Sequence, residues 1–224
     1  MKEVIKLKVG DSLQEAIDRA PEGAVICLPE EIWEENIVIE KSLTLRGADP
    51  KRTVIKSVEE NKPVVWIVKP LGKSSMEVIL ENVALTGALG AGLAVDGLFA
   101  RVILKNLQVS GNGWFGFDIR GSVQVSLINS TLLSNGWGGV FVAQRARVNI
   151  ENTLIEGNKG NGILVADKSH IALSNTTIRN NTGWGIAAMI RKCLYPSDEF
   201  TGTVLWKDRG NKIYNNGKGD ICLP

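Results

Sequence analysis

The sequence is poor in residues that hold metals. Its 224 residues include one histidine, His170, and three cysteines, Cys27, Cys193 and Cys222. A lone histidine leaves no second imidazole for a multi-histidine centre, and the cysteines lack the Cys-x-x-Cys and Cys/His spacings of zinc modules. We therefore expect no metal and no cofactor, and neither a Ser/His/Asp triad nor copper binding by histidine has support.

The sequence has little excess charge of either sign and no long apolar run. Lys and Arg number 26 against 24 Asp and Glu, and the net charge of +2 lacks the concentrated basic surface of a nucleic-acid-binding protein. No run approaches the ~18 apolar residues of a membrane span, and MKEVIKLKVGDS lacks the apolar segment of a secretory signal. We expect no nucleic-acid partner and no membrane span, and localisation stays open between the cytoplasm and a mature exported form.

The sequence does contain a repeat of 23 residues. Asparagine occupies positions 112, 135, 158 and 181, and glycine occupies positions 116, 139, 162 and 185. Within each repeat apolar and polar residues alternate, as in RVNIEN, and no segment has helical spacing,. Strands that recur at fixed spacing without a crossover helix fit a coil whose turns stack in parallel. This pattern predicts a β-helix.

Another asparagine column follows the strands, and it comprises Asn82, Asn106, Asn129, Asn152 and Asn175. Each position comes where the chain must bend, and asparagine tolerates the positive φ that a sharp bend requires. Stacked amides can hydrogen-bond to one another and to the backbone of the bend. We therefore predict that this column is structural and forms one ladder of buried amides.

One domain is predicted to span residues 1–224. Within it we expect a strand and a helix cap over 1–24, β-helix rungs over 25–190, an inserted loop over 191–203 and a final rung over 204–224. The helix prediction rests on the capping-box pair Ser12 and Glu15.

The opening of the chain resembles a known family. The segment SLQEAIDRAPEGAVICLPEEIWEENIVIEKSLTLRGA is similar to the first turns of pectinesterase-like and NosD-like proteins, in which the helix is followed by P-G-x-Y-x-E-x-(I/V)-x-I. Here PEEIWEENIVI replaces the Gly and the Tyr of that pattern. The resemblance to this pectin-lyase-like superfamily implies an all-β solenoid, a right-handed parallel β-helix of roughly seven or eight rungs with an N-terminal α-helical cap.

An acidic and basic cluster is the candidate catalytic site. Alternation along the strand points Asp118 and Arg120 outward, and the 24-residue offset between neighbouring rungs places Asp96 beside Arg120,. Related hydrolases use clustered aspartates as acid and base, and related lyases use acidic calcium ligands with a basic residue. The alternative is an Asp96–Arg120 ion pair on a solvated face, and this interpretation is favoured.

Candidate substrate-binding residues fall in two groups. Arg101, Arg147 and His170 form an outward column that could follow an acidic polysaccharide, although most such columns are only solvated. Trp114 and Trp137 lie in Asn-Gly-Trp turns, where an indole could stack on a sugar ring or cover the turn beneath it. Packing on the turn is the favoured interpretation for the tryptophans.

Outward apolar residues continue the face of Asp118 and Arg120, and they are Phe141, Ala143, Leu164 and Ala166. They predict an exposed patch that either contacts a partner or is covered by a loop. A Cys193–Cys222 disulfide could fasten the inserted loop over the last rung. Because no terminal helix follows that rung, we expect a homodimer joined through the C-terminal end.

Function is the least determined property at this stage. We favour a non-catalytic β-helix module for carbohydrate binding or protein assembly, because the outward cluster lacks a complete catalytic set. The alternatives are a polysaccharide-active lyase or hydrolase that uses the Asp/Arg cluster, and a NosD-like accessory protein. Fold alone does not choose among them.

Overall fold

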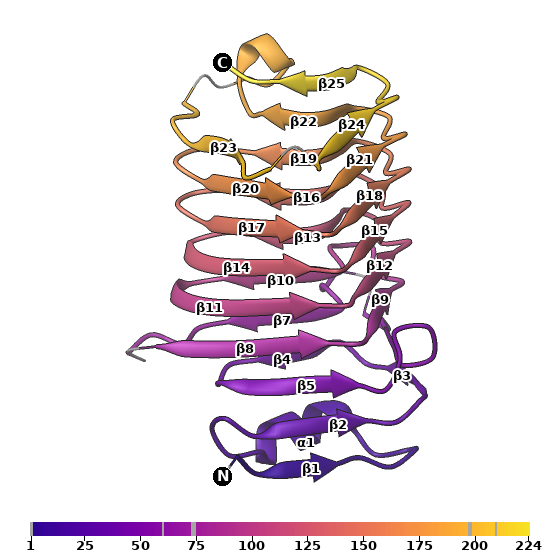
Figure 1. The fold of residues 1–224 in the computed structure, drawn as a ribbon. Helices are drawn as coiled ribbons and strands as arrows, with labels where there is room; N and C mark the ends of the chain where they lie inside the picture. Colours follow the sequence, from indigo (N-terminus) through magenta and orange to yellow (C-terminus); the bar gives the residue numbers. More distant parts are fainter. Residues whose placement is uncertain (1, 60, 73–74, 197–198, 209) are drawn as a thin grey trace.

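A computed structural model describes residues 2–59, 61–72, 75–196, 199–208 and 210–224. Its strands form three sheets, each with strictly parallel pairing (Figure 1). Among the described residues, sheet A contains β1 (Val4–Lys6), β2 (Val25–Leu28), β5 (Leu43–Gly47), β8 (Met76–Glu81), β11 (Leu98–Lys105), β14 (Ser122–Ile128), β17 (Arg147–Glu151), β20 (His170–Ser174) and β23 (Thr203–Trp206).

The other two sheets have the same order along the stack. Sheet B contains β3 (Ile32–Glu34), β6 (Val54–Lys56), β9 (Ala84–Thr86), β12 (Gln108–Ser110), β15 (Thr131–Leu133), β18 (Leu154–Glu156), β21 (Thr177–Arg179) and β24 (Lys212–Tyr214). Sheet C contains β4 (Ile37–Ile39), β7 (Val65–Val68), β10 (Leu93–Asp96), β13 (Phe115–Ile119), β16 (Gly138–Val142), β19 (Asn161–Val165), β22 (Trp184–Ala188) and β25 (Gly219–Cys222).

The chain passes from sheet A to sheet B to sheet C and then begins the next turn. The result is a right-handed parallel β-solenoid of about 8 turns. The 23-residue offset appears directly in the pairing, where Val125 lies opposite Val148 and Val148 lies opposite Ile171. These residues point inward and are almost fully buried, so one apolar column supplies the core for successive turns.

The helix predicted near the N-terminus is one short element, α1 (Leu13–Arg19). The Ser12 hydroxyl accepts a hydrogen bond from the backbone N–H of Glu15, while the Glu35 carboxylate accepts bonds from the N–H groups of Leu13 (2.7 Å) and Gln14 (2.9 Å). A carboxylate at this position stabilises the helix start because it satisfies free N–H groups at the positive end of the dipole. Leu13 and Ile17 are buried in the core of the solenoid.

The five asparagines of the predicted ladder all have positive φ, between 46° and 59°. They lie at the bend from sheet A to sheet B. Their amides are not buried as expected, because a residue in this conformation at an outer corner directs its side chain toward solvent. Hydrogen bonds join Asn106 to Asn82 and Asn175 to Asn152, while Asn152 itself is exposed.

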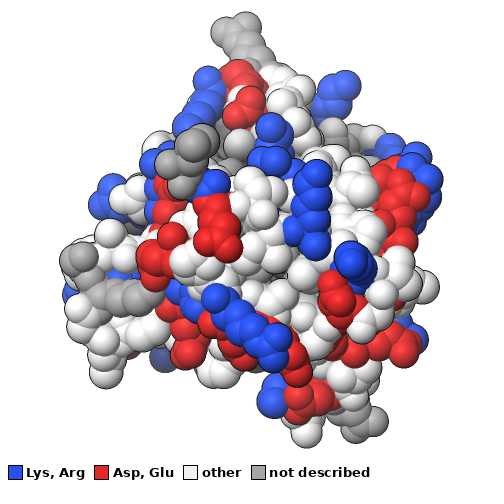
Figure 2. All heavy atoms as spheres, turned by 90° about the horizontal axis from the view of Figure 1, so that it is seen from below, with Lys and Arg blue, Asp and Glu red and all other residues white. Residues whose placement is uncertain are grey.

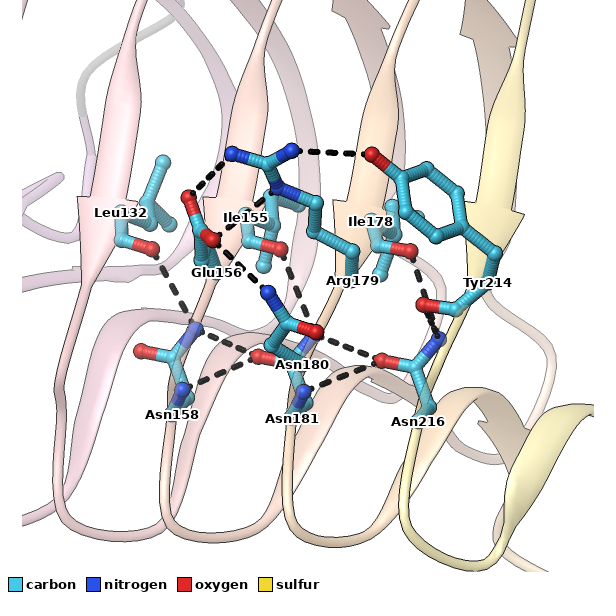
Figure 3. Close-up of polar contacts among 10 residues, drawn as sticks. All are labelled: Leu132, Ile155, Glu156, Asn158, Ile178, Arg179, Asn180, Asn181, Tyr214 and Asn216. Atoms are coloured by element: carbon cyan, nitrogen blue, oxygen red, sulfur yellow. Dashed lines mark hydrogen bonds and ion pairs between the residues drawn. The ribbon is translucent and has the colours of Figure 1, made fainter.

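A continuous buried ladder occupies the turn from sheet B to sheet C. Its members are Asn112, Asn135, Asn158, Asn181 and Asn216, all buried. Figure 3 shows the last three, and the Nδ2 of Asn158 donates to the Oδ1 of Asn181 (2.9 Å) and to the carbonyl of Leu132 (3.2 Å). The Asn181 oxygen also accepts from the backbone N–H of Asn158 (3.1 Å). Each amide therefore binds two neighbouring turns together.

Candidate functional site

The turns held by this ladder carry the rim of a groove on the outer face of sheet C. Trp114 and Trp137 each lie two residues after a ladder asparagine. Their rings meet edge to face with centroids 5.7 Å apart, and Trp137 remains 61% exposed. We call this hollow the sheet C groove; it has a volume of about 400 Å³ and is lined by Trp114, Trp137, Phe141, Arg120, Tyr195 and Lys218, among others.

The floor of the groove is aromatic. Phe115 of β13 and Phe141 of β16 stack with ring centroids 5.3 Å apart and an interplanar angle of 23°. Leu164 of β19 lies next to Phe141 in the strand register. Such a floor offers apolar contact to a ligand, while the exposed indole at the rim keeps one face free for stacking.

Arg120, which lines the groove, forms an ion pair with Asp118. Asp118 lies on β13 and Arg120 directly follows that strand, and the Arg120 Nε and Nη2 groups donate to the two carboxylate oxygens of Asp118 at 2.7 and 3.0 Å. The guanidinium carbon also lies 5.7 Å from the Trp114 ring centroid and 5.1 Å from that of Phe141. Hydrogen bonding to Asp118 raises the pKa of Arg120 further above its already high value.

This pairing differs from the expected Asp96–Arg120 bridge. In the described part of the chain, the ion pair of Arg120 is made with Asp118, and Asp96 is an exposed neighbour at the end of β10. The Arg120 guanidinium lies near the rings of Trp114 and Phe141 and is directed toward the strand that precedes it. Residues two apart on one strand face the same side, so Asp118 meets it.

The inserted loop forms one wall of the groove. It contains the 3-10 helix η1 (Arg191–Cys193), and Cys193 forms a disulfide with Cys222 of β25, with Cα atoms 5.7 Å apart. Tyr195 follows η1, and its hydroxyl oxygen accepts a hydrogen bond from the Nδ2 of Asn161 at the start of β19. Burial raises the pKa of Tyr195, and the bond with Asn161 partly opposes that rise. Residues 197–198 of the predicted insert lie outside the described residues.

The apolar patch expected on this face is covered rather than exposed. Phe141, Ala143, Leu164 and Ala166 are all buried, in one cluster with Ile190 and Cys193. The insert and the aromatic rim share the covering, so little of the patch is left as a flat contact surface. What remains open is the groove between them.

Two lysines give the groove its positive charge. Lys159 and Lys218 follow ladder asparagines in two further turns and line the groove. Neither makes an ion pair with any described residue, whereas the charge of Asp118 is balanced by Arg120. The open charge at the rim is therefore cationic and can attract a carboxylate or a sulfate group.

The basic column lies on another face. Arg101, Gln124, Arg147 and His170 occur in register on sheet A and line a hollow of about 430 Å³. Arg101 is 3.6 Å from Glu77, and the Nδ1 of His170 is 2.8 Å from the Thr203 hydroxyl. The structure thus brings Trp114, Trp137, Asp118 and Arg120 together on sheet C and separates them from the column on sheet A.

Several groove residues were missed by sequence reasoning. Lys159 and Lys218 carry a usable signal, because each follows an asparagine of the same column that precedes Trp114 and Trp137. Tyr195 carries none, since the insert has no counterpart in the other repeats.

No group of three or more His, Cys, Asp or Glu side chains suited to a metal occurs within the described ranges. No helix in them is long and apolar enough to cross a membrane.

A family model described as a right handed beta helix region matches residues 71–223. The chain belongs to this family. No curated protein matches this β-helix. Among solved structures, it is similar to an alginate lyase from Paenibacillus sp. str. FPU-7, with 14% identity over 97% of each chain and a TM-score of 0.61.

Two further solved structures are similar to this β-helix. The Azotobacter vinelandii mannuronan C-5 epimerase AlgE6 A-module is 22% identical over 78% of this chain and 53% of that chain, with a TM-score of 0.66. Pectate lyase Pel9A is 12% identical over 97% of this chain and 81% of that chain, with a TM-score of 0.53. At these identities the likeness establishes the fold, and the site must be argued from its own residues.

Proposed function

We propose that this β-helix binds an acidic polysaccharide in the sheet C groove. The observation that carries the proposal is the combination of an exposed indole at the rim with two lysines that have no ion-pair partner among the described residues. Aromatic faces offer apolar contact to sugar rings, and cations recognise carboxylates by charge-assisted hydrogen bonds. A neutral glycan would use only the first of these features.

Binding without cleavage is favoured by the state of the Asp118 carboxylate. Both of its oxygens accept hydrogen bonds from Arg120, and the side chain is largely buried. A general acid or base needs a carboxyl group that can reach the glycosidic oxygen or a water molecule. Asp118 is instead engaged in holding the guanidinium between two aromatic rings, which is a positioning role.

The test is a titration of the protein with glycans of matched length. Alginate and pectate, whose names occur in those of similar structures, are suitable acidic probes, and a neutral glucan is the control. We expect quenching or enhancement of tryptophan fluorescence with the acidic chains and weakening of binding as salt concentration rises. Equal binding of the neutral glucan, or no binding of any acidic glycan, would contradict the proposal.

A polysaccharide-cleaving enzyme is the second candidate. It is favoured by Arg120 and Tyr195, which line the groove, and by Asp118 and Asp96, which line a neighbouring hollow that shares Arg120. Release of reducing ends or unsaturated products, measured with and without calcium, distinguishes the two. Turnover that disappears in Asp118→Ala would establish the enzyme in place of the binding module.

Two structural roles are proposed with these functions. We infer that α1 acts as a cap, because it buries Leu13 and Ile17 at the end of the stack that Figure 2 views, where acidic and basic side chains are interspersed on the surface.

We also propose the homodimer through the C-terminal end, where Trp206 and Ile221 stay exposed on β23 and β25. Light scattering at about twice the 24.3 kDa chain mass would support the dimer. A monodisperse monomer at high concentration would contradict it.

A further inference from the structure

From β7 onward, the outward residues of sheet C become less exposed along the stack. Trp66 of β7 is 40% exposed, Ala94 of β10 is half-buried, and Asp118 and Phe141 are buried. At β22 the equivalent residue, Ala187, is 0% exposed. The face is therefore open toward the N-terminal strands and sealed toward the C-terminal strands.

The sealing element is the insert, and it is fastened at two points. The Cys193–Cys222 disulfide fixes it to β25, and the hydrogen bond between Tyr195 and Asn161 fixes it over β19. The Lys192 ammonium adds a bond to the carbonyl of Leu223 (2.9 Å). Because the disulfide is covalent, the insert stays attached to β25 when ligand binds.

The groove continues in the open direction. A second hollow of about 400 Å³ is lined by Lys62, Trp66 and Asp96, and it shares Trp114 and Arg120 with the first. The first hollow also reaches the turns before β22 and β25 at its rim, and from β7 to β19, where Tyr195 lies, the two hollows cover four strand spacings, roughly 19 Å,. This is enough for a short stretch of a sugar chain lying along the stack, with one way in and a closed far end.

We propose that the sheet C groove is a blind cleft that takes the end of an acidic polysaccharide chain. The terminal sugar lies against Tyr195, and the rest of the chain leaves over Trp66. This inference rests on the proposed function, since it concerns which part of the same ligand is bound. An internal segment would need an exit on both sides, and the insert occupies one of them.

The experiment counts protein molecules per glycan chain as the chain is lengthened. Oligouronates of defined length and a long polymer of the same sugar are titrated, and the stoichiometry is measured by sedimentation. We expect the number bound to stay at one per chain at every length. A number that grows with chain length overturns the inference while leaving the proposed function intact, and no binding to any of these chains overturns the proposed function itself.

The two chemical ends of the chain are distinguished in the same assay. Reduction of the reducing end to an open-chain alditol alters one terminus, and cleavage that leaves an unsaturated sugar alters the other. We expect one of these modifications to abolish binding and the other to leave it unchanged. Unchanged binding in both cases would contradict recognition of a chain end.

Opening the wall provides the matched variants. In Tyr195→Ala, and in Cys193→Ser combined with Cys222→Ser, the number of proteins per long chain should rise with chain length. Cys27→Ser is the control, because Cys27 is the free cysteine among the described residues and lies far from the groove in β2. Tyr195→Ala keeps the disulfide, so it tests the wall even where the double variant folds poorly. A stoichiometry unchanged in both would overturn the role of the insert.

Discussion

Sheets A and C are built from the same 23-residue repeat, yet their outer faces differ. On sheet A the column from Arg101 to His170 runs in register and lines a polar hollow of about 430 Å³. On sheet C, tryptophans occupy the turns that precede β13 and β16, and an insert follows β22. The comparison teaches that the regular repeat by itself lines a polar hollow, and that an aromatic rim and a wall come from departures at the turns.

The asparagine columns account for part of this difference. The column at the bend from sheet A to sheet B has positive φ and lies at the outer surface, half-buried at Asn82 and exposed in the other four asparagines. The buried ladder from Asn112 to Asn216 lies before sheet C, and each asparagine is followed by residues that project over the groove. A rigid internal ladder therefore supports the rim from beneath.

The largest expected effect separates these two columns. The Asn158 amide donates hydrogen bonds to Asn181 and Leu132 and accepts one from Asn135. Asn158→Leu removes all three bonds, and we expect the free energy of unfolding to fall by an amount on the order of 4 kcal/mol. Asn152→Leu should cost only about 1–2 kcal/mol, through the positive φ at that residue,. Urea denaturation of both variants measures the difference. Equal losses of stability would contradict the claim that only the column of Asn158 is buried and hydrogen-bonded.

The second prediction concerns the wall that sheet A lacks. Replacing Cys193 and Cys222 by serine opens a loop with a sequence separation of 29 and should cost about 3 kcal/mol,. Thiol counting under denaturing, non-reducing conditions should find one free thiol, that of Cys27. Three free thiols would mean that the wall is not covalently fastened in the isolated protein.

Much of the fold was predictable, because alternation and the 23-residue spacing determine which residues pair across neighbouring turns. The identity of the buried ladder was not. Both asparagine columns have the same spacing, and only the backbone conformation of the turn decides that Asn158 points inward and Asn152 outward.

The candidate site was predictable only in its repeating part. Asp118, Arg120 and Trp137 lie at repeat positions, so their placement on one face followed from the offset. The ion-pair partner of Arg120 depends on the rotamer of its side chain, which the spacing of the repeats does not specify. Tyr195 belongs to an insert without a repeat to align it, and its approach to Asn161 depends on the path of that loop.

The third prediction compares ligand binding by the two faces. Trp137→Ala removes an exposed indole from the groove and should weaken binding of an acidic oligosaccharide by about tenfold or more,. Arg147→Ala on sheet A should leave the dissociation constant within about twofold, because rim charges on an open face contribute little. Calorimetry with both variants measures this, and a larger loss from Arg147→Ala would move the site to sheet A.

The smallest effect is a titration of Tyr195. Burial raises its pKa in the folded protein, so the folded state holds the phenolic proton more tightly than the unfolded state does,. Stability from this group is therefore full below the unfolded pKa of about 10 and is lost as pH rises toward the folded pKa. In Tyr214→Phe, absorbance of the remaining tyrosine should titrate at higher pH in buffer than in denaturant. Coincident curves would place Tyr195 in solvent.

Hydroxyl-radical footprinting with and without an acidic oligosaccharide tests the central claim most directly. It reads both faces in one sample, because both side chains are reactive: Trp137 lines the sheet C groove and His170 lies on sheet A. The account predicts that the ligand protects Trp114 and Trp137 from oxidation and leaves His170 unchanged. Protection of His170 with Trp137 unchanged would contradict it.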